Sequence, residues 1–166
     1  MAKPLPLQTA NPSRTAFQKP EWLVLLRELV RTYQAFESHG AAHIRKLGLT
    51  PSQFDIVVTL GNTQGMSCRE LGERTLITKG TLTGVLDRLE SKGLVLREES
   101  AADRRSFTIK LTPKGEACFE RVFPAHLNYL DPAFATLGVE ERRQITANLA
   151  RLRGAFEAPP GSGSGS

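Results

Sequence analysis

The sequence has 166 residues, of which 40% are hydrophobic and 23% are charged, a composition typical of a folded globular chain. No apolar run approaches the roughly 18 residues that a membrane span needs. The first residues also lack the apolar stretch of a secretory signal, so we expect a soluble, cytoplasmic protein. The net charge of +5 is compatible with a polyanionic partner such as nucleic acid, although it does not require one.

Both ends of the chain have the composition of flexible segments. Four prolines fall within residues 1–20, which predicts an extended or disordered N-terminal tail. Residues 159–166 are two prolines followed by repeated Gly-Ser, which is typical of a linker or an expression scar. The fold must therefore be built from the residues between these tails.

The first and last predicted helices are amphipathic. A stripe of apolar residues at steps of four and three predicts a dimerisation helix over residues 21–48. A final helix from about Val139 to Phe156 has a similar face, and residues 116–158 are predicted to form C-terminal dimerisation helices interrupted or kinked at Pro124 and Pro132. Packing of these faces against each other within one chain is the alternative. The first stripe contains Trp22, Leu26, Leu29, Tyr33, Phe36, Ile44 and Leu47.

Helix-start signals divide the middle of the chain. Thr50 to Gln53 and Ser67 to Glu70 both have the pattern of a capping box, and they predict helices over about 51–61 and 68–74. Thr78 is expected to cap a further helix that ends at Gly93. Two short helices joined by a tight turn are the outline of a helix-turn-helix. The apolar residues of the second helix are Leu82, Val85, Leu86 and Leu89.

The pattern then changes from helix to strand. Leu94 to Glu98 is a strand candidate, and Phe107, Ile109 and Leu111 alternate with polar residues at the period of a half-buried strand. The polar segment between them predicts a β-hairpin with a basic tip, called a wing. Residues 49–115 are therefore expected to form a winged helix-turn-helix DNA-binding domain, and the fold class is mainly α with a small β-wing.

Four segments in this region resemble the MarR family of bacterial winged helix-turn-helix regulators. This resemblance implies a homodimer with interlocking outer helices and a repressor released from DNA by a small molecule, an oxidant or a metal. Two departures concern DNA contacts: Gly84 stands where arginine or another polar residue is common, and residues 100–102 lack the usual acidic or proline residues. The four segments are Thr78 to Thr83, Asp87 to Val95, Asp103 to Arg105 and Leu111 to Gly115.

The helix over about 79–91 has a face that we expect to meet DNA. Successive residues turn by about 100°, which places Gly80, Thr83, Gly84 and Asp87 opposite the apolar stripe. Exposed glycines cost a helix roughly 1 kcal/mol each, so such a face favours close approach by another surface, for which the major groove is the candidate. An ordinary solvated face is the alternative. The predicted DNA-binding residues are Lys79, Gly80, Thr81, Thr83, Gly84, Arg88, Asp103, Arg104 and Arg105.

At the wing tip, residues two apart share a face of the hairpin. Asp103 is therefore expected to pair with Arg105 and to hold it extended toward the minor groove, where negative potential is concentrated. Arg104 should face the other way and contact phosphate or solvent. The alternative is a plain surface ion pair, which contributes about 0–1 kcal/mol to stability.

The sequence has no phosphate loop or nucleophile motif, so we expect no enzyme, no catalytic residues and no cofactor. The resemblance implies a small organic effector such as an aromatic carboxylate. The histidines of the chain also admit a zinc or copper site, because His39 and His43 are four residues apart and His126, Glu37 or a cysteine could supply a third ligand. Cys68 near a helix start admits a redox switch, but we expect both it and Cys118 to be buried hydrophobes. Effector candidates, with core packing as the alternative, are Tyr33, Phe36, His39, His43, Phe54, Phe123 and His126.

Overall fold

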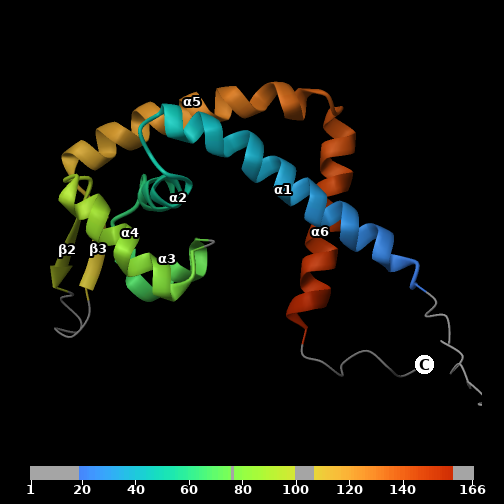
Figure 1. Ribbon diagram of the computed structural model, residues 1–166, viewed down its shortest axis with the longest axis horizontal. Helices are drawn as coiled ribbons and strands as arrows, with labels where there is room; N and C mark the ends of the chain where they lie inside the picture. Colours follow the sequence, from blue (N-terminus) through green and yellow to red (C-terminus); the bar gives the residue numbers. More distant parts are fainter. Residues whose placement is uncertain (1–18, 76, 100–106, 159–166) are drawn as a thin grey trace, which may run out of the picture. The chain divides into compact units, whose positions relative to one another are not determined.

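The computed structural model describes residues 19–75, 77–99 and 107–158. Residues 1–18 of the predicted N-terminal tail, the predicted C-terminal tail and the tip of the hairpin lie outside these residues. Six helices and three short strands make up the described chain (Figure 1). The chain divides into two compact units, Met1–Glu37 and Ser38–Ser166. None of the described helices is long and apolar enough to cross a membrane.

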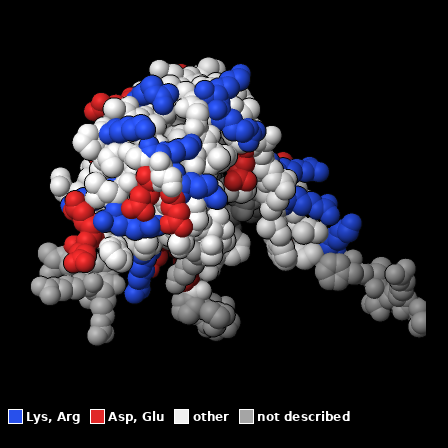
Figure 2. All heavy atoms as spheres, turned by 60° about the vertical axis from the view of Figure 1, so that its left-hand side comes forward, with Lys and Arg blue, Asp and Glu red and all other residues white. Residues whose placement is uncertain are grey.

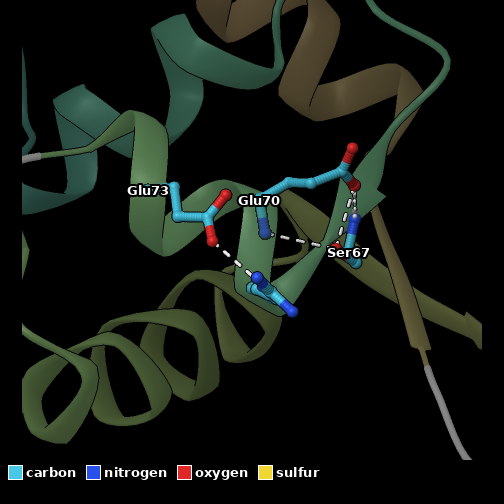
Figure 3. Close-up of polar contacts among 4 residues, drawn as sticks. Ser67, Glu70 and Glu73 are labelled. Atoms are coloured by element: carbon cyan, nitrogen blue, oxygen red, sulfur yellow. Dashed lines mark hydrogen bonds and ion pairs between the residues drawn. The ribbon is translucent and has the colours of Figure 1, made fainter.

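The first helix begins one residue after the predicted position, and the next two begin where the capping signals predict. Helix α1 covers Trp22–Lys46, α2 covers Pro51–Leu60 and α3 covers Cys68–Arg74. At the start of α3 the Glu70 amide donates to Ser67 Oγ at 3.2 Å, and the Ser67 amide donates to a Glu70 carboxylate oxygen at 2.9 Å (Figure 3). The same reciprocal bonds start α2. Local sequence therefore fixes both helix starts.

The fourth helix, α4, covers Lys79–Ser91 and departs from prediction at its first turn. Thr78 occupies the cap position, but its side chain makes no capping bond to the backbone. Its hydroxyl instead lies 3.1 Å from the hydroxyl of Thr81. The predicted side-chain cap is therefore wrong. The other end is as expected, since Gly93 follows the helix with a φ of +67°.

The predicted hairpin is confirmed as strands β2 (Val95–Glu99) and β3 (Phe107–Leu111). A third strand that the sequence did not predict, β1 (Met66–Ser67), pairs antiparallel with β3 and gives the sheet order β1-β3-β2. Two residues are too few to show an alternating pattern. Ile109 stands opposite Arg97 on one side and Met66 on the other.

The core lies between α2, α3, α4, the sheet and the first half of α5 (Pro113–Ala135). Gly115 shows how closely these elements approach, because a Cβ there would collide with the carbonyl oxygen of Leu94. Thr112 fixes the same junction by donating its hydroxyl to the Gly93 carbonyl at 2.6 Å. The side chains most completely buried are Ile56, Val57, Leu60, Leu71, Val85, Leu86, Leu89, Val95, Ile109 and Val122.

The last two helices, α5 and α6 (Val139–Glu157), correct one prediction and leave an open face. Helix α5 continues through both Pro124 and Pro132, so neither proline ends it. Each proline removes one backbone donor, but Val122 and His126 on either side of Pro124 are buried and hold the helix in place. Helix α6 forms as predicted, yet none of its residues is buried in the single chain.

The two cysteines differ in environment. Cys118 is buried on α5, as expected of a small hydrophobe. Cys68 is exposed, so the prediction that it is buried is wrong. It is the first residue of α3, directly after the cap, whereas the residue of that helix that faces the core is Leu71.

Candidate nucleic-acid interface

Helix α4 has one buried face and one open face. Its apolar residues are buried against the core, as the spacing predicts. Gly80, Thr81, Thr83 and Arg88 are exposed and Gly84 is half-buried. Lys79 begins the helix, and its side chain lies outside the part of the chain that the structure describes. The fold therefore leaves open the face on which we expect DNA contacts.

The two glycines of this open face have no packing role within the chain. A Cβ added at Gly80 or at Gly84 would meet no other atom within 4 Å. An alanine at either position would stabilise a helix by roughly 1 kcal/mol. Intrachain packing therefore gives no reason for glycine at these two positions, and close approach by an external surface stays a prediction.

The predicted wing residues Asp103, Arg104 and Arg105 lie outside the described residues. Of the two strands that flank them, β2 ends at Glu99 and β3 begins at Phe107. Strand β2 packs against α4, so the hairpin is attached directly to the helix with the open face. The individual roles of the three tip residues remain predictions.

Arg97 is a charged residue of this region that sequence reasoning missed. From the middle of β2 it donates to Asp87 Oδ1 at 2.6 Å and to Glu90 Oε2 at 2.7 Å, both on α4. The hydrogen bond that Arg97 donates to Asp87 raises the pKa of the Arg97 guanidinium, which therefore stays charged. An arginine ten and seven residues from its partners gives no local sequence signal, because only the packing of β2 on α4 brings them together.

Charges of both signs lie next to one another around this interface (Figure 2). On the hairpin, Lys110 contacts Glu98 at 2.6 Å across the two strands. Arg88 differs, because it has no carboxylate within ion-pair distance among the residues that the structure describes. It is thus an exposed cation on α4 with its charge available to a phosphate.

A second group of predicted residues meets where the end of α1 lies beside α5. His43 Nδ1 lies 3.1 Å from His126 Nδ1, so one nitrogen must donate and the other accept. Burial, followed by the neighbouring charges of His43 and His39, lowers the pKa of His126. The Phe54 ring contacts the His126 ring edge-on at a centroid distance of 4.8 Å. Tyr129 also contacts these rings.

Tyr129 was absent from the prediction although its spacing gave a signal. It follows His126 by three residues and therefore shares its face of α5. Its ring stacks on His43 at a centroid distance of 4.1 Å, and its hydroxyl donates to the His39 carbonyl at 3.3 Å. We define the aromatic cluster as five residues, namely His39, His43, Phe54, His126 and Tyr129.

The remaining effector candidates are described by their own surroundings. Phe123 stacks on Phe119 at 5.3 Å and packs against the core. Tyr33 and Phe36 belong to the unit Met1–Glu37, where both are exposed and the Tyr33 hydroxyl donates to Glu37 at 2.8 Å. Within the described residues, no group of three or more His, Cys, Asp or Glu side chains is placed to hold a metal ion.

Comparison with known proteins matches residues 49–107 to the MarR family. The transcriptional regulator MhqR of Bacillus subtilis is 32% identical over 130 residues, covering 78% of this chain and 90% of that protein. A structure of Bordetella bronchiseptica BpsR, described as regulated in DNA binding by 6-hydroxynicotinic acid, shares 26% identity over 82% of this chain and 97% of its own, with a TM-score of 0.72. The repressor CouR, bound to a 23-mer DNA duplex, shares 27% over 82% and 98%, with a TM-score of 0.69.

Proposed function

The chain belongs to the MarR family of DNA-binding transcriptional regulators, and from this premise we propose that it is a homodimeric, ligand-released repressor. The observation that carries the proposal is the open face of α4, where two glycines serve no packing within the chain. The structure of CouR on a DNA duplex supports the same mode of action.

Dimerisation is proposed from the apolar faces at the two ends of the chain. Trp22, Leu25 and Phe36 are exposed on α1, and Ile145 and Leu149 are exposed on α6. Large apolar side chains at helical spacing, all open to solvent, favour burial against a second copy. Each compact unit of the single chain leaves part of such a face uncovered.

DNA recognition is proposed to use two elements of each protomer. Helix α4 would enter the major groove with Thr81 and Thr83 near base edges or phosphates. The hairpin would place Arg105 in the flanking minor groove, and Arg104 at a phosphate. A two-fold dimer then requires a near-palindromic site with half-site centres about 34 Å, or a multiple of that distance, apart.

The effector is proposed to be a small aromatic carboxylate bound at the aromatic cluster. Three imidazoles and two aromatic rings offer flat apolar walls with a few polar atoms, as small-molecule sites do. The action of 6-hydroxynicotinic acid on BpsR supports this chemical class. A ligand that prefers the arrangement unable to bind DNA, with about 1–3 kcal/mol of coupling, would lower DNA affinity about 5–150-fold.

Selection of bound sequences from random duplexes tests the DNA proposal directly. We expect enrichment of a near-palindrome, which reports both sequence reading and two-fold geometry. Enrichment of a single, non-repeated half-site would contradict the dimeric mode. Binding of all duplexes with equal affinity would contradict sequence-specific recognition.

Calorimetry tests the effector proposal. The panel contains benzoates, hydroxycinnamates and their thioesters, with Zn²⁺ and Cu²⁺ as the competing class. We expect an organic acid to bind and to release the selected duplex. Tight metal binding that changes DNA affinity, without a response to any organic acid, would instead favour the metal-responsive alternative, which has the His43–His126 pair as its structural support.

A further inference from the structure

The open face of α4, which we propose to meet DNA, includes two acidic side chains. Gly80, Thr83, Asp87 and Glu90 follow one another at steps of three and four and therefore lie along one stripe of the helix. The first two are neutral, but the last two are carboxylates with half or nearly half of each side chain exposed. Carboxylates on a face that meets DNA repel the phosphates. A helix that reads DNA with this stripe needs those charges compensated.

We infer that Arg97 is a positioning and charge-compensating residue that makes the acidic half of α4 compatible with DNA. The inference rests on the proposed function, because it takes the open face of α4 as the DNA-facing one. It assigns to a strand residue outside that helix a role in both the affinity and the specificity of DNA binding. No contact between Arg97 and DNA is required.

The geometry of Arg97 is suited to this role. One guanidinium reaches two carboxylates three residues apart, with Nη2 on Asp87 and Nη1 on Glu90. Its backbone stands opposite Ile109 in the sheet, and Ile109 is fully buried. Only 27% of the Arg97 side chain is exposed. Both ends of the residue are therefore fixed, and both carboxylates are held toward the strand.

The charges of α4 show what Arg97 contributes. Lys79 and Arg88 balance Asp87 and Glu90, so the net formal charge of α4 is zero. Helix α4 taken together with Arg97 has one net positive charge. Without it, two carboxylates lose their partner on the stripe that would approach a polyanion. DNA affinity should respond to this change more than folding does, because many phosphates add their repulsion.

Three variants separate compensation from a purely structural role. Arg97→Gln unmasks both carboxylates and should weaken binding to the selected duplex about tenfold at moderate salt. The triple variant Arg97→Gln/Asp87→Asn/Glu90→Gln leaves nothing to compensate and should return to within about threefold of the parent. Asp87→Asn/Glu90→Gln keeps Arg97 and should bind unrelated duplexes about tenfold more tightly, with a steeper dependence on salt.

The matched control is Arg143→Gln, which removes one cation from an exposed ion pair with Glu140 on α6. It changes the net charge by the same amount and should alter DNA affinity less than about twofold. Melting temperatures of all variants report folding. Should Arg97→Gln fail to fold, the Asp87→Asn/Glu90→Gln variant still tests the inference through its binding to unrelated duplexes.

Two results would overturn the inference. One is an Arg97→Gln protein that folds and binds DNA as the Arg143→Gln control does. The other is a triple variant that folds but stays as weak as Arg97→Gln, since the defect would then come from shape and not from unmasked charge. A parent protein that binds no duplex would overturn the proposed function, and this inference with it.

Discussion

Helices α4 and α6 have similar apolar spacing in sequence, but the apolar face of α4 is buried and that of α6 is exposed. Leu82, Val85, Leu86 and Leu89 on α4 are at most 4% exposed, whereas Ile145, Leu149 and Phe156 on α6 are 44%, 48% and 72% exposed. Periodicity thus identifies an apolar face but not what covers it. The neighbouring sheet and helices cover that of α4, and we propose that a second chain covers that of α6.

The largest effect is expected inside the covered region. Leu86→Ala removes a side chain that is 1% exposed and should lower the free energy of unfolding by about 2–5 kcal/mol, because the cavity adds to the lost burial. Chemical denaturation at fixed protein concentration measures this. A loss below about 1 kcal/mol would show that the core relaxes around the site.

Leu149→Ala is the matched change on the uncovered helix. In a dimer this substitution truncates two interface side chains. We therefore expect the dissociation constant of the dimer to rise about 30–100-fold, equivalent to about 2–3 kcal/mol. Sedimentation across a concentration series measures the dissociation constant. A parent protein that is a folded monomer at micromolar concentration would contradict the explanation of the open face.

The hairpin tip offers a test outside the described residues. Arg105→Ala should weaken binding to the selected duplex by about 1–3 kcal/mol without changing the melting temperature. Asp103→Ala should act in the same direction but less strongly, since it only releases the arginine. Arg104→Ala is the neighbouring control and should have the smaller, salt-dependent effect of a phosphate contact. Equal binding by Arg105→Ala and the parent at moderate salt would remove the minor-groove assignment.

The open face of α4 is tested by adding a single methyl group. Gly84→Ala should stabilise the fold by about 0.5–1 kcal/mol, because glycine is unfavourable in a helix and the added Cβ meets no atom. It should also weaken DNA binding if the backbone approaches the groove closely. Denaturation and duplex titration together report these opposite signs. A stabilised variant with unchanged DNA affinity would place Gly84 away from the DNA.

The smallest effect concerns pH and the covered histidine. His126 is 6% exposed, and its pKa in the fold is lowered from the ordinary value of 6.5. Below pH 6.5 the unfolded chain therefore binds more protons than the folded one, so stability falls as pH drops from 6.5 toward the folded pKa. We expect denaturation at several pH values to show this loss in the parent and a smaller loss in His126→Gln. An equal loss in both would assign the pH dependence to other groups.

Much of the fold follows from local sequence, for reasons that the structure makes plain. The capping boxes at Thr50 and Ser67 satisfy backbone donors within one turn. The alternation from Phe107 to Leu111 predicts the strand, although only Ile109 of its apolar face is buried and Phe107 is exposed. These interactions join residues a few positions apart. The helix starts, the hairpin and the open face of α4 could therefore be predicted from the residues alone.

Tertiary structure decided which distant groups meet. The pairing of Arg97 with Asp87 and Glu90 depends on how β2 packs on α4. The contact of His43 with His126 depends on two helices that bring together residues 83 positions apart. The prediction that Cys68 is buried was wrong, and α5 is not interrupted at Pro124, because burial and helix continuity depend on what packs around a residue. Composition and periodicity supplied the elements of this protein, whereas the charge balance on the open face of α4 arises only when strand and helix are assembled.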